Sequence, residues 1–323
     1  MCDARIRRFR KTLNLERADR LSMGDLVFAE YRPDVYHLGD GGESVPEKGR
    51  VGRTRDGKRA VTRDGGVWAI DAKEKYRTAE DVLDVDLARF AAESLDGVML
   101  DQMAELIEKK SARGFVVPLH YGTLVTRCTI EFGWEPFLMA AALDPPGFAK
   151  ILDTFGAASL AVVSGWAQIE GVELIAVHDD IAATRGPILS PDFLRQYCLP
   201  WYRQLFEAIH QSGRKVLYVC DGNYLPFVDD LLAAEPDGLY IESSSMDPRE
   251  FMSRGGRDKL YLLKTSNQNI DMGTPDDIRA ELEQLRDLHC DYPGICIYRG
   301  GGEPLPGNAE AFAQYYEELL VYS

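Results

Sequence analysis

Short apolar runs alternate with longer segments of helical periodicity from about residue 82 to the end of the chain. The apolar runs have the length of buried strands, and the segments between them repeat apolar residues every three or four positions. This alternation predicts successive β–α–β units and therefore a parallel sheet. The expected strands are residues 114–119, 172–177, 215–219, 238–242, 259–264 and 294–298, with an earlier one near 24–29.

Seven strands are one short of the eight that a closed parallel barrel needs. The eighth can lie within residues 38–76, where many glycines, charged residues and short alternating runs are typical of a β-hairpin. No long linker and no internal repeat divides the chain. We therefore predict an α/β fold, a single (β/α)8 TIM-type barrel domain over residues 1–323, with 38–76 as an irregular hairpin insertion near its N-terminal end.

Two of the expected helices have clear end signals. Ser190, followed by Pro191, is placed to cap a helix that ends at Gly213, and Thr274 begins a later one in the same way. Pro200 lies inside the first of these helices and should kink or divide it.

The composition excludes several kinds of partner. The 52 acidic and 37 basic side chains give a formal charge of −15, which repels phosphate backbones and anionic membranes. No stretch approaches the roughly 20 apolar residues of a membrane span, and no apolar segment follows the basic N-terminus as in a signal peptide. Six scattered cysteines without a CxxC pair are typical of reduced thiols. We expect a cytoplasmic protein that binds neither nucleic acid nor membrane.

Polar residues follow nearly every predicted strand at its carboxyl end. In a parallel α/β barrel the active site is built there, because the loops after the strands converge at that end. The candidates are His120, Tyr121, His178, Asp179, Asp180, Cys220, Asp221, Glu242, Lys264, Arg299 and Glu303. The position of the site as a whole is a firmer inference than any single member.

Several of these residues have a structural alternative. Either aspartate after His178 can cap a helix, and His178 itself is as consistent with a structural hydrogen bond as with catalysis. Cys220 is more typical of an unreactive buried thiol than of a ligand or nucleophile. Asp221 precedes Gly-Asn and can simply form a turn. Because neighbouring strand residues point to opposite faces, we expect only one of Cys220 and Asp221 at the barrel mouth, and favour Asp221.

Charged strand ends are harder to explain as structural. Glu242 and Lys264 follow buried strands, so they need partners, which they can provide for each other. The segment YRGGGEPLPGN, with three glycines before a helix, is a weak candidate for anion binding. The chain lacks the GxSxG, HExxH and EF-hand motifs, so hydrolase and kinase templates are not supported.

Residues 172–250 resemble the uroporphyrinogen decarboxylase superfamily, which includes the decarboxylase and methyltransferases that act on corrinoid proteins. The likeness lies in HDDIAATRGPILSPDFLRQYCLPWYRQLFEAIHQSGRKVLYVCDGNYLPFVDDLLAAEPDGLY. It extends more weakly to KTLNLERADRL and FGWEPFLMAAALDPPGFAKILD. The resemblance implies a (β/α)8 barrel, in agreement with the strand pattern.

The similarity favours the methyltransferase-like branch. The decarboxylase has an RQAGRY-like stretch whose arginines bind substrate carboxylates, whereas this chain has VFAEYRPDVYH with Arg32 alone. In the methyltransferases, zinc is held by the His and Cys of HSCG and by a later Cys. Those positions fall here on Val219, on Asp221 and on Gly301 or Gly302.

The resemblance thus implies methyl transfer between a small methylated substrate and a corrinoid (cobalamin) protein docked over the barrel mouth. The candidate ligands of a rearranged zinc site are Cys220, Asp221 and Glu242. The candidate catalytic residues are Asp221, Asp179, Asp180, His178, Lys264 and Tyr121, and the candidate substrate-binding residues are His120, Arg32, Arg299 and Glu303. A homodimer is common in this family.

Two alternatives remain open from the sequence. The first is a cofactor-free decarboxylase or lyase, in which one of the aspartates protonates a carbanion-like centre and cations clamp a carboxylate. The candidate cations are Arg32, Lys264, Arg185 and Arg299. The second is a small-molecule-binding barrel without catalytic activity.

Overall fold

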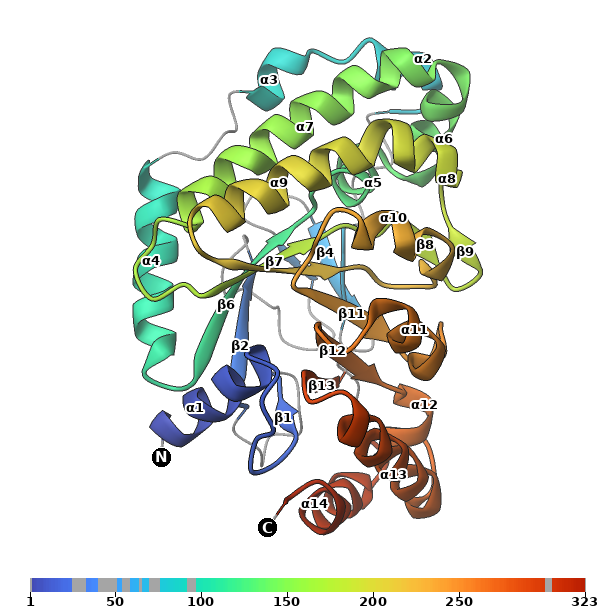
Figure 1. Ribbon diagram of the computed structural model, residues 1–323. Coiled ribbons are helices and arrows are strands. Elements are labelled where there is room, and N and C mark those ends of the chain that lie inside the picture. Colours follow the sequence, from blue (N-terminus) through green and yellow to red (C-terminus); the bar gives the residue numbers. More distant parts are fainter. Residues whose placement is uncertain are drawn as a thin grey trace.

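Eight parallel strands form a barrel at the centre of the structure, which is a computed structural model (Figure 1). The two ends of the sheet meet where Gly24 bridges Val35 and where the N–H of Asp34 donates to the carbonyl of Met23 at 2.8 Å. The predicted (β/α)8 fold is confirmed. In their order round the barrel the strands are β1 (Ser22–Met23), β13 (Ile295–Arg299), β12 (Leu260–Thr265), β11 (Gly238–Glu242), β10 (Lys215–Val219), β7 (Leu174–His178), β6 (Phe115–Tyr121) and β2 (Val35–Gly39).

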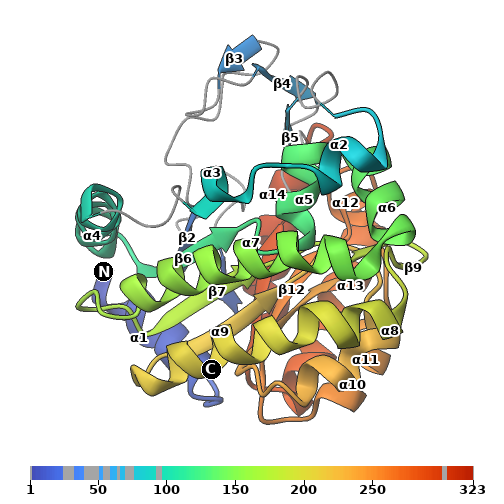
Figure 2. The same ribbon diagram turned by 90° about the horizontal axis from the view of Figure 1, so that it is seen from above.

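The structure describes residues 2–24, 33–39, 51–53, 59–63, 66–69, 76–91, 97–299 and 304–322. The six later strands lie within two residues of their predicted bounds, whereas most of the predicted strand 24–29 lies outside the described residues. The eighth strand, β2, begins at Val35, just before the predicted insertion. Within the insertion, β3 (Val51–Arg53), β4 (Arg59–Arg63) and β5 (Gly66–Ala69) form a small antiparallel sheet, which Figure 2 shows outside the barrel.

Helices surround the barrel, and from β6 onward they return the chain from the carboxyl end of one strand to the beginning of the next (Figures 1 and 2). Helix α7 is long and apolar enough by length and composition to cross a membrane, but nine of its residues are buried within the protein. The longer helices are α4 (Gly97–Ser111), α6 (Trp134–Leu143), α7 (Pro145–Trp166), α9 (Leu199–Gln211), α13 (Pro275–Asp291) and α14 (Asn308–Leu319). Shorter ones are α2 (Ala79–Leu83), α3 (Leu87–Ala91), α5 (Val125–Phe132), α8 (Pro191–Phe193), α10 (Val228–Leu232), α11 (Pro248–Gly255) and α12 (Asn267–Ile270).

The strands are buried on both faces, and their side chains divide between two apolar clusters. Alternate residues such as Val117, Ala176 and Leu217 fill the barrel interior, together with Phe9 and Leu13 of helix α1 (Cys2–Leu13). The intervening residues pack outward, against the helices. This division decides which strand-end side chains face the barrel mouth.

The helix that contains Pro200 is continuous but irregular. The hydroxyl of Ser190 accepts the N–H of Phe193 at 3.2 Å, as predicted for the cap. A π-helical turn over Leu194–Cys198 then precedes α9, and the N–H of Leu199 bonds back to the carbonyl of Leu194. The wider turn accommodates the proline, which lacks an N–H and crowds the preceding turn.

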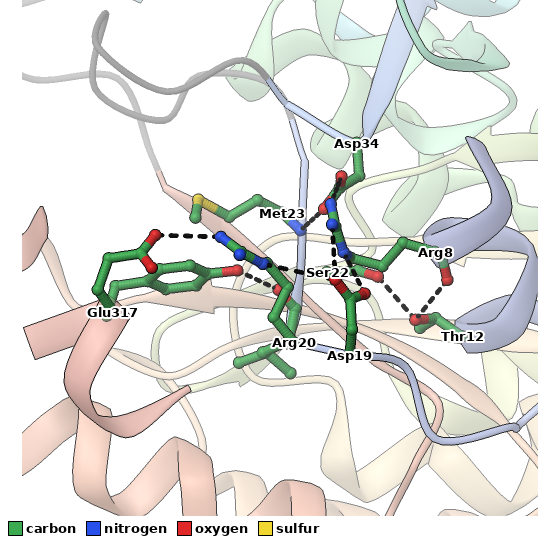
Figure 3. Close-up of polar contacts among 10 residues, drawn as sticks. Arg8, Thr12, Asp19, Arg20, Ser22, Met23, Asp34 and Glu317 are labelled. Atoms are coloured by element: carbon green, nitrogen blue, oxygen red, sulfur yellow. Dashed lines mark hydrogen bonds and ion pairs between the residues drawn. The ribbon is translucent and has the colours of Figure 1, made fainter. Parts of the chain in front are cut away.

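A polar network holds α1 against the amino-terminal end of the barrel (Figure 3). The guanidinium of Arg8 donates to Asp34 at 2.5 Å and to Asp19 at 2.7 Å, and Asp34 also accepts the N–H of Met23 at 3.1 Å. Asp34 is almost fully buried. The network therefore fixes β1 and β2 where the sheet closes.

Candidate active site

Strand alternation separates the polar strand ends into two groups. Leu217 and Val219 of β10 lie in the interior cluster, so Asp221, two residues further, continues on that side. Cys220 belongs to the outer cluster and is fully buried, whereas Asp221 is exposed. The expectation that Asp221 rather than Cys220 reaches the mouth agrees with this arrangement.

Four other predicted residues share the inward register. Ala176 precedes His178 by two positions, Leu262 precedes Lys264, and Tyr240 precedes Glu242, each in the interior cluster. Val117 and Leu119 lead in the same way to the exposed Tyr121. The inward group is Tyr121, His178, Asp221, Glu242 and Lys264.

His178 and Asp180 form the central pair of this group. The Nε2 atom of His178 lies 3.3 Å from Oδ1 of Asp180, and the ring stacks on Tyr121 with centroids 4.2 Å apart. Burial alone lowers the pKa of His178, but the hydrogen bond that its Nε2 donates to Asp180 and the charges of Asp180 and Asp221 outweigh it, so the pKa is raised. Burial alone raises the pKa of Asp180, yet His178 and the N–H of Asp221 hold it below its ordinary value. The pair is therefore favoured as imidazolium and carboxylate.

Asp221 has the opposite tendency. Although the residue is exposed as a whole, neighbouring side chains partly desolvate its carboxyl, which raises its pKa; the negative charges of Asp180 and Glu242 add to the effect, while Lys264 and His178 oppose it. The hydroxyl of Tyr240 hydrogen-bonds this carboxyl. A carboxyl whose pKa is raised next to ionised neighbours holds a proton more tightly than a free aspartate, which is the direction that suits a general acid.

Glu242 and Lys264 are each other's partner, as predicted. The Nζ atom of Lys264 lies 2.6 Å from Oε1 of Glu242. The other carboxylate oxygen accepts the N–H of Gly222 and the hydroxyl of Ser245, both at 2.9 Å. Burial alone raises the pKa of Glu242, but Lys264 and these donors lower it overall. The pair is a fixed ionic element beside Asp221.

Asp179 lies on the outer side of the barrel wall, away from the mouth, and has a structural role. Its carboxylate accepts the N–H of Thr126 at 2.8 Å, at the start of α5, and the hydroxyl of Tyr202 at 2.6 Å. It is fully buried, and burial raises its pKa despite these donors. The same Thr126 accepts the N–H of Asp180 at 2.6 Å through its hydroxyl. Asp179 thus positions the loop that carries Asp180.

Three further candidates also point outward. His120 is buried, with Nε2 2.9 Å from the hydroxyl of Ser159 on α7. Arg299 is buried and donates from Nε to Asp271 at 2.7 Å. Burial raises the pKa of the Cys220 thiol well above its usual value, which disfavours a thiolate. The structure does not bring these side chains together with Asp221.

The predicted zinc ligands do not converge. Cys220 lies in the outer register, Asp221 and Glu242 in the inner one, and Glu242 is committed to Lys264. Within the part of the chain that the structure describes, no three His, Cys, Asp or Glu side chains are grouped as metal ligands. The described donor set therefore does not fit a zinc ion. Arg32, Glu303 and the segment with Gly301 and Gly302 lie outside the described residues.

Two aromatic residues were not predicted. Tyr240 and Tyr298 are in the inward register, and their rings lie 6.3 Å apart. Side chains two residues apart on a strand point to the same face. Counting back two positions from Glu242, and likewise from the other strand ends, could therefore have identified them.

A parallel barrel with acids, a histidine and a lysine on its carboxyl end belongs to the class of barrel enzymes whose active sites lie at that end. The model of the family described as uroporphyrinogen decarboxylase (URO-D) matches residues 124–297, which is more than half of the chain. The chain therefore belongs to the uroporphyrinogen decarboxylase family.

A solved structure with a similar fold is a methyltransferase from Methanosarcina mazei, 14% identical over 97% of this chain and 98% of that chain, with a TM-score of 0.66. At that identity the likeness concerns the fold. Weaker matches include the 3-keto-D-glucoside 4-epimerase YcjR from E. coli, 15% identical over 71% of this chain and 95% of that chain, with a TM-score of 0.39. Another is the GH26 domain of a Prevotella bryantii endo-beta-mannanase/endo-beta-glucanase, 10% identical over 94% of this chain and 91% of that chain, with a TM-score of 0.44. No match was found among curated proteins.

Proposed function

We propose that this chain is a methyltransferase that moves a methyl group between a small methylated substrate and a corrinoid carried by a partner protein. The proposal rests on the family, which includes enzymes of this kind, and on one observation in particular. Asp221 is a carboxyl with a raised pKa, placed beside the His178–Asp180 and Lys264–Glu242 pairs. The site thus combines one carboxyl of raised pKa with two internally neutralised ion pairs.

Such an acid suits the departure of a methyl group. When the bond from methyl carbon to oxygen, nitrogen or sulfur breaks, the heteroatom keeps the electron pair and needs a proton, while the methyl group passes to the corrinoid as co-substrate. Asp221 supplies that proton, and Lys264 and His178 stabilise the carboxylate that remains. Tyr121, stacked on His178, holds the ring in place. No step is assigned to zinc.

Exposed apolar side chains support docking of a partner at this end. Helix α6 follows β6 and precedes the return helix α7, so it lies on the carboxyl side of the barrel. The turns before α13 and α14 lie on that side for the same reason. The large hydrophobic side chains that are exposed in the described chain belong to these segments, together with Tyr121 at the end of β6; they are Tyr121, Trp134, Met139, Leu143, Met272 and Leu305. Apolar side chains exposed at one end of a barrel are consistent with a protein-binding surface there.

The charges at the mouth give less support to the decarboxylase alternative. A carboxylated substrate needs free cations, but Lys264 is paired with Glu242 and Arg299 with Asp271. Among the cations proposed for this role, Arg185 lies exposed on the turn of a short hairpin, β8 (Ala182–Ala183) and β9 (Gly186–Pro187).

The test is an assay of methyl transfer to free cob(I)alamin, with methoxy, methylamino and methylthio compounds as methyl donors. The reaction is monitored by the loss of the cob(I)alamin absorbance. Asp221→Asn should slow the reaction by about 10² to 10⁴-fold, the usual contribution of a general acid. Asp192→Asn, an exposed aspartate on α8, is the matched control and should retain the rate. Absence of methyl transfer from every donor, together with release of CO2 from carboxylated compounds, would replace the proposal by the decarboxylase alternative.

A further inference from the structure

Buried oxygen atoms without hydrogen-bond partners are concentrated behind the carboxyl end of β12. In the described chain, eight buried side-chain nitrogen or oxygen atoms lack a partner, and four of them are oxygens. The four nitrogens are spread over four distant residues. The four oxygens, in contrast, all lie between residues 265 and 281 and belong to Thr265, Asn267, Asp271 and Glu281. Buried polar atoms are almost always paired in native proteins, so this concentration points to a ligand.

Several contacts place Thr265, Asp271 and Glu281 near one another, and Asn267 follows Thr265 by two positions at the start of α12. Thr265, the last residue of β12, is in register with Arg299 of β13, so the two side chains are neighbours on the outer face of the barrel. Arg299 donates to one carboxylate oxygen of Asp271 at 2.7 Å, and the other oxygen of Asp271 is unpaired. Glu281 accepts the N–H of Ser266, next to Thr265, at 2.6 Å through one oxygen, and its other oxygen is unpaired.

Among the residues that the structure describes, the charges at this place do not balance. Asp271 and Glu281 are 2% and 7% exposed, and Arg299 supplies one positive charge for the two carboxylates. Burial raises the pKa of Glu281, and the charge of Asp271 adds to it. One buried negative charge therefore requires a proton or a further cation, because an unpaired buried charge is costly.

The chemistry of the free atoms identifies the cation class. Carboxylate, hydroxyl and amide oxygens are the ligands of hard cations. A divalent ion would bring the local charge to +1 beside the Arg299 guanidinium, whereas a monovalent ion makes it zero. We propose that the oxygens of Thr265, Asn267, Asp271 and Glu281 bind a monovalent cation, sodium or potassium.

The site would tie β12 to helices α12 and α13. Thr265 directly follows Lys264, whose side chain points into the barrel mouth on the opposite side of the strand. The cation would thus fix the strand end that carries Lys264, whatever reaction the mouth performs.

The first test is thermal unfolding of the full chain at pH 8 and constant ionic strength. Potassium or sodium chloride replaces tetramethylammonium chloride, whose cation is too large for the site. The melting temperature should rise with the small cation and then saturate, as for any ligand of the folded state. Glu281→Gln should abolish the rise, and Glu283→Gln, on the same helix and paired with Arg279, should preserve it.

Several outcomes would overturn the proposal. These are equal melting temperatures in all three salts, an unchanged dependence in Glu281→Gln, or a rise with magnesium or calcium but with neither monovalent ion. If Glu281→Gln does not fold, Thr265→Val replaces it, since valine keeps the volume and removes the oxygen. Crystals grown with thallium(I) give an independent readout. An anomalous peak among the four oxygens supports the site, and a map without it contradicts the site.

Discussion

The ion pair between Lys264 and Glu242 gives the sharpest test of the site's electrostatics. Lys264→Met removes the ammonium and leaves the Glu242 carboxylate, whose side chain is 14% exposed, with two donors, Gly222 and Ser245. Breaking a fully buried pair costs about 3–5 kcal/mol. Because both partners retain some exposure and two donors remain, we expect a loss of about 2–3 kcal/mol in the free energy of unfolding.

A double-mutant cycle measures the pair itself. Glu242→Gln and the double variant Lys264→Met/Glu242→Gln complete the cycle. The free energy of unfolding of each variant is measured by urea denaturation, monitored by tryptophan fluorescence and circular dichroism. The double variant should be less destabilised than the sum of the single variants by about 1–2 kcal/mol, because no unpaired charge is left buried. Additivity of the two single losses within about 0.5 kcal/mol would refute the coupling.

Three further predictions concern stability. Asp34→Asn removes the buried counter-ion of Arg8 and should cost about 2–4 kcal/mol in urea unfolding, against less than about 1 for the exposed Asp19→Asn; equal losses would contradict this. Burial lowers the pKa of His289 to about 4, below its ordinary 6.5. Between pH 6.5 and 4 this histidine is protonated in the unfolded chain but not in the folded chain. The free energy of unfolding should therefore fall by up to ~3 kcal/mol over this range, and His289→Gln should reduce that fall. Identical pH profiles for the two proteins would refute the prediction. Gly222→Ala should cost about 1–3 kcal/mol in urea unfolding, since residue 222 has φ +78° and an added Cβ lies 2.8 Å from a backbone oxygen; a wild-type midpoint would contradict the strain.

The barrel and the end that carries the site were predictable because strand and helix periods alternate regularly along the chain. The orientation of individual side chains was harder to predict. Strands of a parallel barrel are apolar on both faces, so their sequences do not reveal which residues point inward. The predicted strand ended at residue 119, whereas β6 continues to Tyr121. Because successive side chains alternate, an error of one residue at a strand end exchanges the mouth for the outer layer, as the neighbours His120 and Tyr121 show.

The residues that point outward show that the sequence does not reveal which side chains pair with each other. His120, Asp179 and Arg299 each follow an apolar run, as an active-site residue does, but their partners come from other elements. Arg299 binds Asp271, 28 residues earlier, and His120 binds Ser159 on α7. Only the packed fold identifies such pairs, because nothing in the local sequence marks the partner.

Thr126 couples the rim of the barrel to the acid–base pair. Its N–H donates to Asp179 and its hydroxyl accepts the N–H of Asp180, so one residue at the start of α5 holds both aspartates. Helix α5 is followed directly by α6, which presents three of the exposed apolar side chains. A displacement of α6 would therefore reach Asp180, and with it the hydrogen bond to His178, through α5 and the two hydrogen bonds of Thr126.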